Sequence, residues 1–258
     1  MKLSRHWHAF VTAVQFLTRV PLPGGMNRPE PDRTLLRAAV VYFPLVGGLI
    51  GAFTSSVIAV SLFFWPPVVA VTLGLIAEAL LTGAFHEDAV ADCCDALGGG
   101  WTREDVLRIL KDSRVGSFGA FGLILAVLLR GGCLLALPSD LLIPAVVASA
   151  AVGRWAILVL MWAVPPVPYR EGLSKDVGER IGGRDLVVGS LFMLIALTAL
   201  ASLKPLAALL GVGAVLVVTL AWGWYVRRRI GGVTGDVLGS ACYLGQCVLL
   251  LAATGGVR

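Results

Sequence analysis

The sequence predicts an all-α integral membrane protein: a polytopic bundle of about seven transmembrane helices plus an N-terminal amphipathic interfacial helix. Of its 258 residues, 57% are hydrophobic and 14% are charged, and the mean hydropathy is +0.86. In a soluble domain roughly a quarter of the residues are charged, so a soluble fold would lack the charges to cover its surface. Apolar runs of about 18 to 25 residues recur, each long enough to cross a bilayer as a helix. A membrane β-barrel would need short alternating segments, which this sequence does not contain.

The first segment, residues 7–20, is amphipathic. Its apolar face comprises Phe10, Ala13, Val14 and Leu17, and its polar face comprises His8, Thr12, Gln15 and Arg19. Such a helix suits the membrane interface better than a span, and Pro21 ends it. We therefore expect a single domain, residues 1–258, with an interfacial and cytoplasmic segment over residues 1–34 and a transmembrane bundle over residues 36–253.

Seven apolar segments follow this helix, separated by proline-containing turns and by two longer polar segments, 86–114 and 165–185. The predicted spans are residues 36–64, 68–85, 115–137, 141–164, 186–203, 205–226 and 236–253. No internal repeat divides them, which is consistent with one domain.

The distribution of basic residues predicts the orientation. With the N-terminus inside, 17 of the 21 Lys and Arg residues fall on the inner side, Lys204 and Arg258 fall outside, and Arg130 and Arg154 fall within predicted spans. Cytoplasmic loops carry such an excess. We expect a multi-pass protein of the cytoplasmic (inner) membrane, with the N-terminus and both long polar segments cytoplasmic and the C-terminus outside. The same bias accounts for the net charge of +5, so no nucleic-acid partner is expected.

An acidic cluster follows the second predicted span. Asp88, Asp92 and Asp95 are spaced i, i+4, i+7, so a helix would place them on one face. Like charges beside hydrocarbon repel one another and are costly to desolvate, and a divalent cation would offset both penalties. Oxygen ligands favour Mg²⁺, which predicts a metal site at the cytoplasmic end of this span. The alternative is a solvated helix end whose acids pair with the bases of residues 103–114.

Two further stretches supply candidates for the same site. Lys111 and Arg114 lie before the third predicted span with Gly116, which suggests an anion clamp or a plain juxtamembrane basic segment. Asp236 begins the last span after Thr234, so it could complete the metal site or lie in an ordinary capped first turn.

Charged residues inside predicted spans need partners or a watery cavity. Arg154 lies within the fourth span, and Glu78, within the second, is one candidate partner. A cytoplasmic substrate cavity could be lined by Gly116, Thr234 and Arg170, although Arg170, in the second polar segment, could equally lie in a solvated loop.

Together these groups suit attack on a phosphorus centre, with a metal to neutralise diphosphate oxygens. Patterns typical of P-loop, GxSxG and HExxH enzymes do not occur. The rival interpretations are a CDP-alcohol phosphotransferase, whose full motif does not occur here, a cation or proton-coupled transporter, and a scaffold for partner enzymes. The transporter is disfavoured because its site would lie at the membrane midplane.

Several motifs are similar to those of a known family. They are FLTRVPLP, YFPLVGGLIG, TGAFHEDAVADCCDALGGG, KDSRVGSFG and GVTGDVLG. On them, nearly the whole chain resembles the cobalamin synthase family, the adenosylcobinamide-GDP ribazoletransferases, which are integral membrane enzymes of late cobalamin assembly. The family pattern is matched by His86, Asp88, Asp92 and Asp95, while Ala89 and Ala96 stand where glycine is usual.

The resemblance implies that a ribose hydroxyl of α-ribazole, or of its 5′-phosphate, attacks the phosphorus attached to cobinamide, and that GMP leaves. It implies Mg²⁺ as cofactor and the lipid bilayer as surroundings, and it leaves open a homo-oligomer or an association with other cobalamin-assembly enzymes. Its implied metal ligands are Asp88, Asp92, Asp95 and Asp236, and its implied phosphate-binding residues are Lys111, Arg114 and Arg154. His86 would orient a carboxylate ligand or accept a proton, and an aspartate such as Asp92 or Asp95 could equally be the base.

Overall fold

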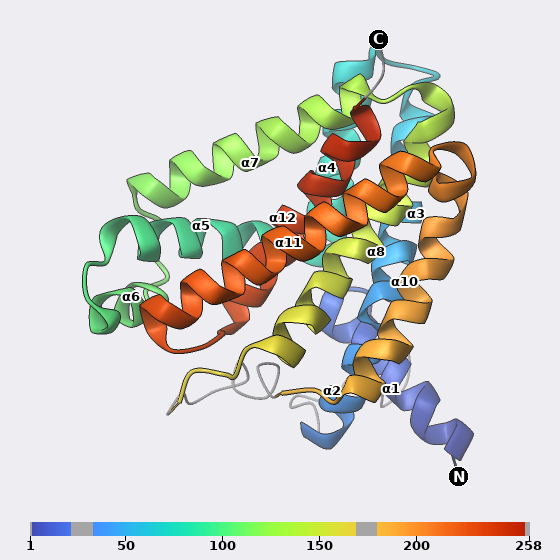
Figure 1. Cartoon of the computed structure of the whole chain (residues 1–258). Coiled ribbons are helices and arrows are strands. Elements are labelled where there is room, and N and C mark those ends of the chain that lie inside the picture. The colour runs from blue at the N-terminus through green and yellow to red at the C-terminus, as the bar shows by residue number, and fades with distance from the viewer. Residues whose placement is uncertain (1, 22–32, 169–179, 256–258) are drawn as a thin grey trace.

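The computed structural model describes residues 2–21, 33–168 and 180–255 (Figure 1). Long α-helices run between two ends of a bundle, and the N- and C-terminal ends of the chain lie at opposite ends of it. Among the described residues, six helical segments are long and apolar enough to cross a membrane, and a seventh span arises if a bent helix pair is counted as one. The predicted polytopic helical bundle is therefore confirmed.

The helices correspond closely to the predicted segments. The first apolar segment, Leu35–Ser61, consists of α2 (Arg33–Ala39), the 3-10 turn η1 (Val40–Tyr42) and α3 (Phe43–Ser61). The others are α4 (Pro67–Thr82), α7 (Ser117–Ala136), α8 (Ser139–Ala163), α10 (Gly183–Leu203), α11 (Pro205–Ile230) and α12 (Gly235–Thr254).

Helix α1 (Lys2–Leu17) lies beside the bundle near its N-terminal end (Figure 1). Ala9, Ala13 and Leu17 recur on one face and are buried, whereas Trp7 is exposed. Thr12, assigned to the polar face, is also buried, so the predicted division into two faces holds only in part. The helix starts five residues earlier than expected and ends three residues earlier. An apolar face directed inward and a polar face directed outward are typical of an interfacial helix.

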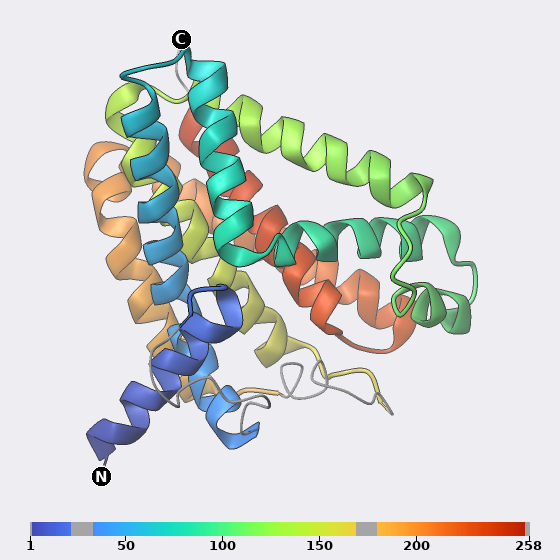
Figure 2. The same ribbon diagram turned by 180° about the vertical axis from the view of Figure 1, so that it is seen from behind.

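The second predicted span, 68–85, needs a correction at its end. Helix α4 stops at Thr82, and Gly83 and Ala84 take left-handed conformations with φ of 74° and 56°. The chain then bends by 90° and continues as α5, Phe85–Gly99 (Figure 2). Left-handed residues commonly end helices. The turn also meets a distant segment, because Arg19 lies against Gly83 and its backbone N–H donates to the carbonyl of Leu81 at 2.7 Å.

The polar segment 86–114 is largely helical. Helix α5 crosses between α7 and α11 in Figure 1, and the short helix α6 (Arg103–Ile109) follows it beside the end of α11. Thr102 and Asp105 form a capping box at the start of α6, which satisfies the first free backbone N–H groups of that helix. Arg229 of α11 donates to the carbonyl of Gly100 at 2.6 Å and thereby ties the two elements together.

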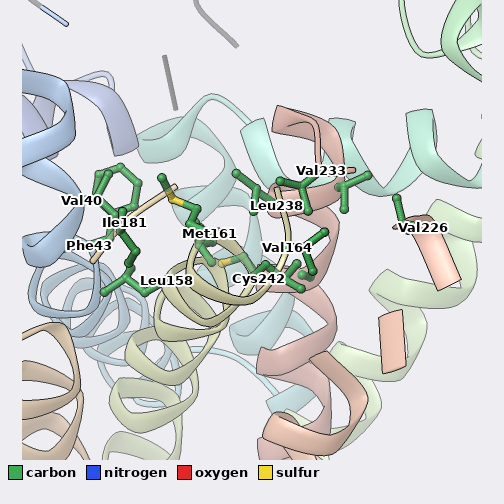
Figure 3. Close-up of a cluster of buried hydrophobic side chains, with 14 of the residues drawn as sticks. Val40, Phe43, Leu158, Met161, Val164, Ile181, Val226, Val233, Leu238 and Cys242 are labelled. Carbon is green, nitrogen blue, oxygen red and sulfur yellow. The ribbon is translucent and has the colours of Figure 1, made fainter. Parts of the chain in front are cut away.

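Helix α8 is the centre of the bundle, with 83% of its span buried. It packs against α3, α10, α11 and α12. Small residues permit this approach: a Cβ added to Gly47 of α3 would come within 2.5 Å of the Ala150 carbonyl oxygen, and one on Gly153 would come equally close to that of Cys242. Close packing at small residues is how helices associate in membranes. Figure 3 shows the apolar cluster where α3, α8, α11 and α12 meet, with Phe43, Leu158 and Met161 inside it.

Candidate functional site

The predicted acidic face lies on α5. This helix runs unbroken from Phe85 to Gly99, so Asp88, Asp92 and Asp95 share one face, as their spacing predicts. The charges of Asp88 and Asp95, and also that of Asp236 on α12, act on the carboxylate of Asp92. Carboxylates from two helices, α5 and α12, are thus close enough to Asp92 to interact with it electrostatically.

Helix α12 reaches α5 because neither carries a large side chain where they cross. A Cβ added to Gly239 would lie 2.6 Å from the Cβ of Ala89. Asp88 and Asp236, on either side of this crossing, line the same cavity of about 240 Å³. The pairing of the acidic motif with the late Asp236 is therefore a product of helix packing.

Thr234 caps helix α12. Its Oγ1 accepts from the backbone N–H of Val237 at 3.3 Å, and its hydroxyl donates to Oδ2 of Asp236 at the same distance. The capping interpretation of Thr234 is confirmed. The buried hydroxyl also orients the Asp236 carboxylate, so capping and a supporting role in the site are compatible.

Asp95 is held at the N-terminus of α7. Its two oxygens accept from the backbone N–H groups of Gly116 at 2.6 Å and Gly119 at 2.7 Å. A carboxylate is stabilised at a helix N-terminus, where backbone donors are otherwise unpaired. The predicted close approach at Gly116 is thus made by Asp95. Each carboxylate oxygen keeps a further lone pair, so a metal ligand role for Asp95 stays a prediction.

Lys111 and Arg114 lie on the connection between α6 and α7 and are exposed. Arg114 pairs with Asp112 at 2.7 Å, and the hydrogen bond from its guanidinium lowers the pKa of Asp112 to about 2. Such solvent-exposed pairs contribute little to stability. Both bases are therefore accessible to an anion, two to five residues from the Gly116 contact.

A buried ion pair occupies the bundle interior. Arg130 of α7 contacts Glu78 of α4 at 2.7 Å and Glu87 of α5 at 3.7 Å, and Thr54 of α3 donates to Glu78 at 2.8 Å. The direct partner of Glu78 is therefore Arg130 and not Arg154, so the suggested Glu78–Arg154 pair is wrong. The sequence places two cations, Arg130 and Arg154, and one acid, Glu78, within spans. The packing of α4 against α7 pairs Glu78 with Arg130.

Arg154 and His86 are both fully buried, at 0% and 2% exposure. Arg154 donates from Nη1 to the carbonyl of Ala150 at 3.3 Å. Within the described part of the chain, its Nε and Nη2 and the Nε2 of His86 have no hydrogen-bond partner. The charges of Arg154 and Arg130 act on His86. Arg154 is thus buried in the bundle, whereas Lys111 and Arg114 are exposed.

The remaining predicted residue, Arg170, lies outside the described residues. Within residues 2–21, 33–168 and 180–255, no group of three His, Cys, Asp or Glu side chains is placed to hold a metal ion. Mg²⁺ typically takes only one or two protein carboxylates and completes its shell with water and phosphate oxygens. Two of the carboxylates among Asp88, Asp92 and Asp236 would meet that requirement, whereas all three are not placed to bind one ion.

The fold and the site define a class: a polytopic helical membrane protein with a carboxylate-rich face beside exposed bases. The family is shown by sequence comparison, since residues 9–254 match the model of the cobalamin-5-phosphate synthase family. The chain belongs to this family.

Curated relatives cover nearly all of the chain. A protein of Ralstonia pickettii (strain 12J) called adenosylcobinamide-GDP ribazoletransferase is 39% identical over 251 residues, covering 96% of this chain and 95% of the relative. A protein of the same description from Shewanella sp. (strain W3-18-1) is 38% identical over the full length of both chains. No solved structure matches.

Proposed function

We propose that this protein is an adenosylcobinamide-GDP ribazoletransferase that acts in the nucleotide-loop assembly step of cobalamin biosynthesis. Its substrates are adenosylcobinamide-GDP and α-ribazole or its 5′-phosphate, and its products are adenosylcobalamin or its 5′-phosphate, and GMP. The observation that carries this proposal is the match of the whole chain to relatives of that name, together with the carboxylate face that α5 and α12 form.

Two carboxylates among Asp88, Asp92 and Asp236 would hold Mg²⁺, in agreement with their mutual electrostatic influence and their oxygen-only chemistry. When bound, the ion neutralises diphosphate oxygens and the charge that develops on the departing phosphate. Asp95 contributes by fixing α7 against α5 through its two backbone contacts, which places the exposed bases next to the carboxylate face.

The reaction exchanges one P–O bond for another. The ribose oxygen forms a bond to the phosphorus attached to cobinamide, the bond from that phosphorus to the GMP oxygen breaks, and the hydroxyl proton passes to a base. His86, Asp92 and Asp95 are the alternatives for this base. Lys111 and Arg114 bind phosphate oxygens, while the buried Arg154 acts through its charge.

The distribution of basic residues between the two ends of the bundle supports the orientation with the N-terminus inside. Helix α6, with Arg103 and Arg108, and the last turn of α11, with the basic residues 227–229, lie toward one end of the bundle, while the connection between α10 and α11, which carries Lys204, lies toward the other (Figure 1). Basic residues accumulate on the cytoplasmic side. We infer that the site faces the cytoplasm, that the C-terminus is outside and that the membrane is the cytoplasmic one.

The test uses the purified protein in lipid bilayers with adenosylcobinamide-GDP and α-ribazole 5′-phosphate. We expect GMP release that requires Mg²⁺ and that falls at least about 100-fold in Asp92→Asn, because loss of one charge-stabilising group typically costs that much. Asp140→Asn, an exposed acid of α8 outside the site, is the matched control and should retain full activity.

Two outcomes would contradict the proposal. GMP release that persists without Mg²⁺ and in Asp92→Asn would refute the metal site. Cation flux without any GMP release would favour a transporter instead.

A further inference from the structure

The cavity beside the carboxylates is walled by aromatic rings. It lies where α1, α3, α5, α8 and α12 meet and has a volume of about 240 Å³. The rings of Phe16 and Phe43 are nearly parallel, with centroids 5.6 Å apart and an interplanar angle of 9°, and Phe85 meets Phe16 edge-on at 5.5 Å. Offset and edge-to-face contacts are the preferred arrangements of aromatic rings, so a planar ring entering the cavity meets surfaces suited to both.

The rest of the cavity lining is apolar apart from two carboxylates. The described residues that complete its lining are Asp88, Ala89, Ile157, Gly235, Asp236, Leu238 and Gly239. Asp88 and Asp236 are the only charged groups among the described lining residues, and both carry oxygen acceptors. The cavity therefore combines apolar and aromatic contacts with two of the proposed metal carboxylates.

We propose that this cavity binds the planar aromatic base of the acceptor nucleoside. The inference rests on the proposed function and adds the location of one substrate to it. A base packed against the accessible rings of Phe16 and Phe85 lies in the same cavity as Asp88 and Asp236, so its attached ribose would be near these carboxylates. Since the ribose hydroxyl is the attacking group, it must lie beside the phosphorus that those carboxylates serve.

Size and polarity argue for this base over the guanine of the second substrate. Pockets that enclose a whole drug-sized ligand measure roughly 300–1,000 Å³, so about 240 Å³ suits a single base. Guanine carries acceptors at O6 and N7. Burying them against phenylalanine rings and carboxylates, none of which donates a hydrogen bond, would leave them unsatisfied. A base with few polar edge atoms meets no such penalty.

The binding test uses benzimidazole, a planar two-ring heterocycle, with the full-length protein in bilayers and without adenosylcobinamide-GDP or Mg²⁺. We expect wild-type protein to bind it. In Phe85→Leu, which keeps an apolar side chain but removes the ring, the Kd should rise roughly 5- to 150-fold, the equivalent of about 1–3 kcal/mol of stacking at about 1.36 kcal/mol per tenfold. Phe121→Leu, an exposed ring on α7 away from the cavity, is the matched control and should bind as wild type.

Steady-state kinetics supply the second measurement. Benzimidazole should compete with the acceptor nucleoside and not with adenosylcobinamide-GDP. In Phe85→Leu the KM for the nucleoside should rise by the same 5- to 150-fold as the Kd, while the KM for adenosylcobinamide-GDP stays unchanged. Phe16→Leu, on a different helix, gives an independent variant should Phe85→Leu fail to fold.

Three results would overturn the inference. The first is equal binding of benzimidazole by wild type, Phe85→Leu and Phe16→Leu, and the second is competition of benzimidazole with adenosylcobinamide-GDP. The third is displacement of benzimidazole from detergent-solubilised protein by added phospholipid, which would make the cavity a lipid site. These failures differ from a failure of the proposed function. If only the assignment of the cavity is wrong, Mg²⁺-dependent GMP release continues normally. If the proposed function is wrong, no GMP is released at all.

Discussion

Ion pairs occur both in the interior and on the surface of this protein. Glu78 and Arg130 are 3% and 2% exposed and contact each other at 2.7 Å, whereas Arg108 and Asp105 form an exposed pair at 3.3 Å. Removing one partner of a buried pair leaves an uncompensated charge, which is far more costly than losing a surface pair.

Arg130→Met should therefore lower the free energy of unfolding by about 3–5 kcal/mol, measured by denaturant unfolding in mixed micelles. Arg108→Met is the matched control and should change stability by no more than about 0.5 kcal/mol. Equal stability of wild type and Arg130→Met would show that the pair does not hold α4 and α7 together.

At this scale the sequence predicted the shared face of the acids but not the residues that they contact. The spacing of Asp88, Asp92 and Asp95 sufficed to place them on one face, because helical periodicity is local. It could not reveal that Asp95 accepts from Gly116 and Gly119, since that contact depends on how two helices pack.

At the scale of elements, the junction of α5 and α7 depends on glycine. A Cβ on Gly119 would come within 2.8 Å of the Ala91 carbonyl oxygen and would overlap the Asp95 carboxylate. By contrast, Gly132, on the same helix, has open space around it.

Gly119→Ala should therefore separate α7 from α5, lower the free energy of unfolding by about 1–3 kcal/mol and reduce GMP release. Gly132→Ala should instead be neutral or stabilising by up to about 1 kcal/mol, because alanine is the better helix former. Thermal unfolding and GMP release, measured on both variants, check this. Identical behaviour of the two variants would contradict the assigned contact.

At the scale of the whole molecule, α6 and the α11–α12 connection lie toward one end of the bundle, and the turns that join α7 to α8 and α10 to α11 lie toward the other (Figures 1 and 2). Ser113 precedes α7, and Ser139 begins α8 at the far end of α7; both are exposed. The inferred orientation places Ser113 in the cytoplasm and Ser139 outside.

In sealed, right-side-out vesicles, a membrane-impermeant maleimide should label Ser139→Cys at once and Ser113→Cys only after permeabilisation. Wild-type protein reports the background from the native cysteines, which are buried or partly buried. The reverse labelling pattern would invert the orientation and place the site outside.

The sequence by itself determined the helical membrane class, the positions of the spans to within a few residues, the asymmetry of charge and the acidic face of α5. Each depends on composition, segment length or helical period, which act over short stretches of chain. Only the tertiary structure decided the 90° turn after α4, the meeting of Asp88 with Asp236, the Glu78–Arg130 pair and the phenylalanine-lined cavity. These join residues far apart in the chain, and they arise because close packing of small residues and pairing of buried charges select one arrangement of helices among many that the same pattern allows.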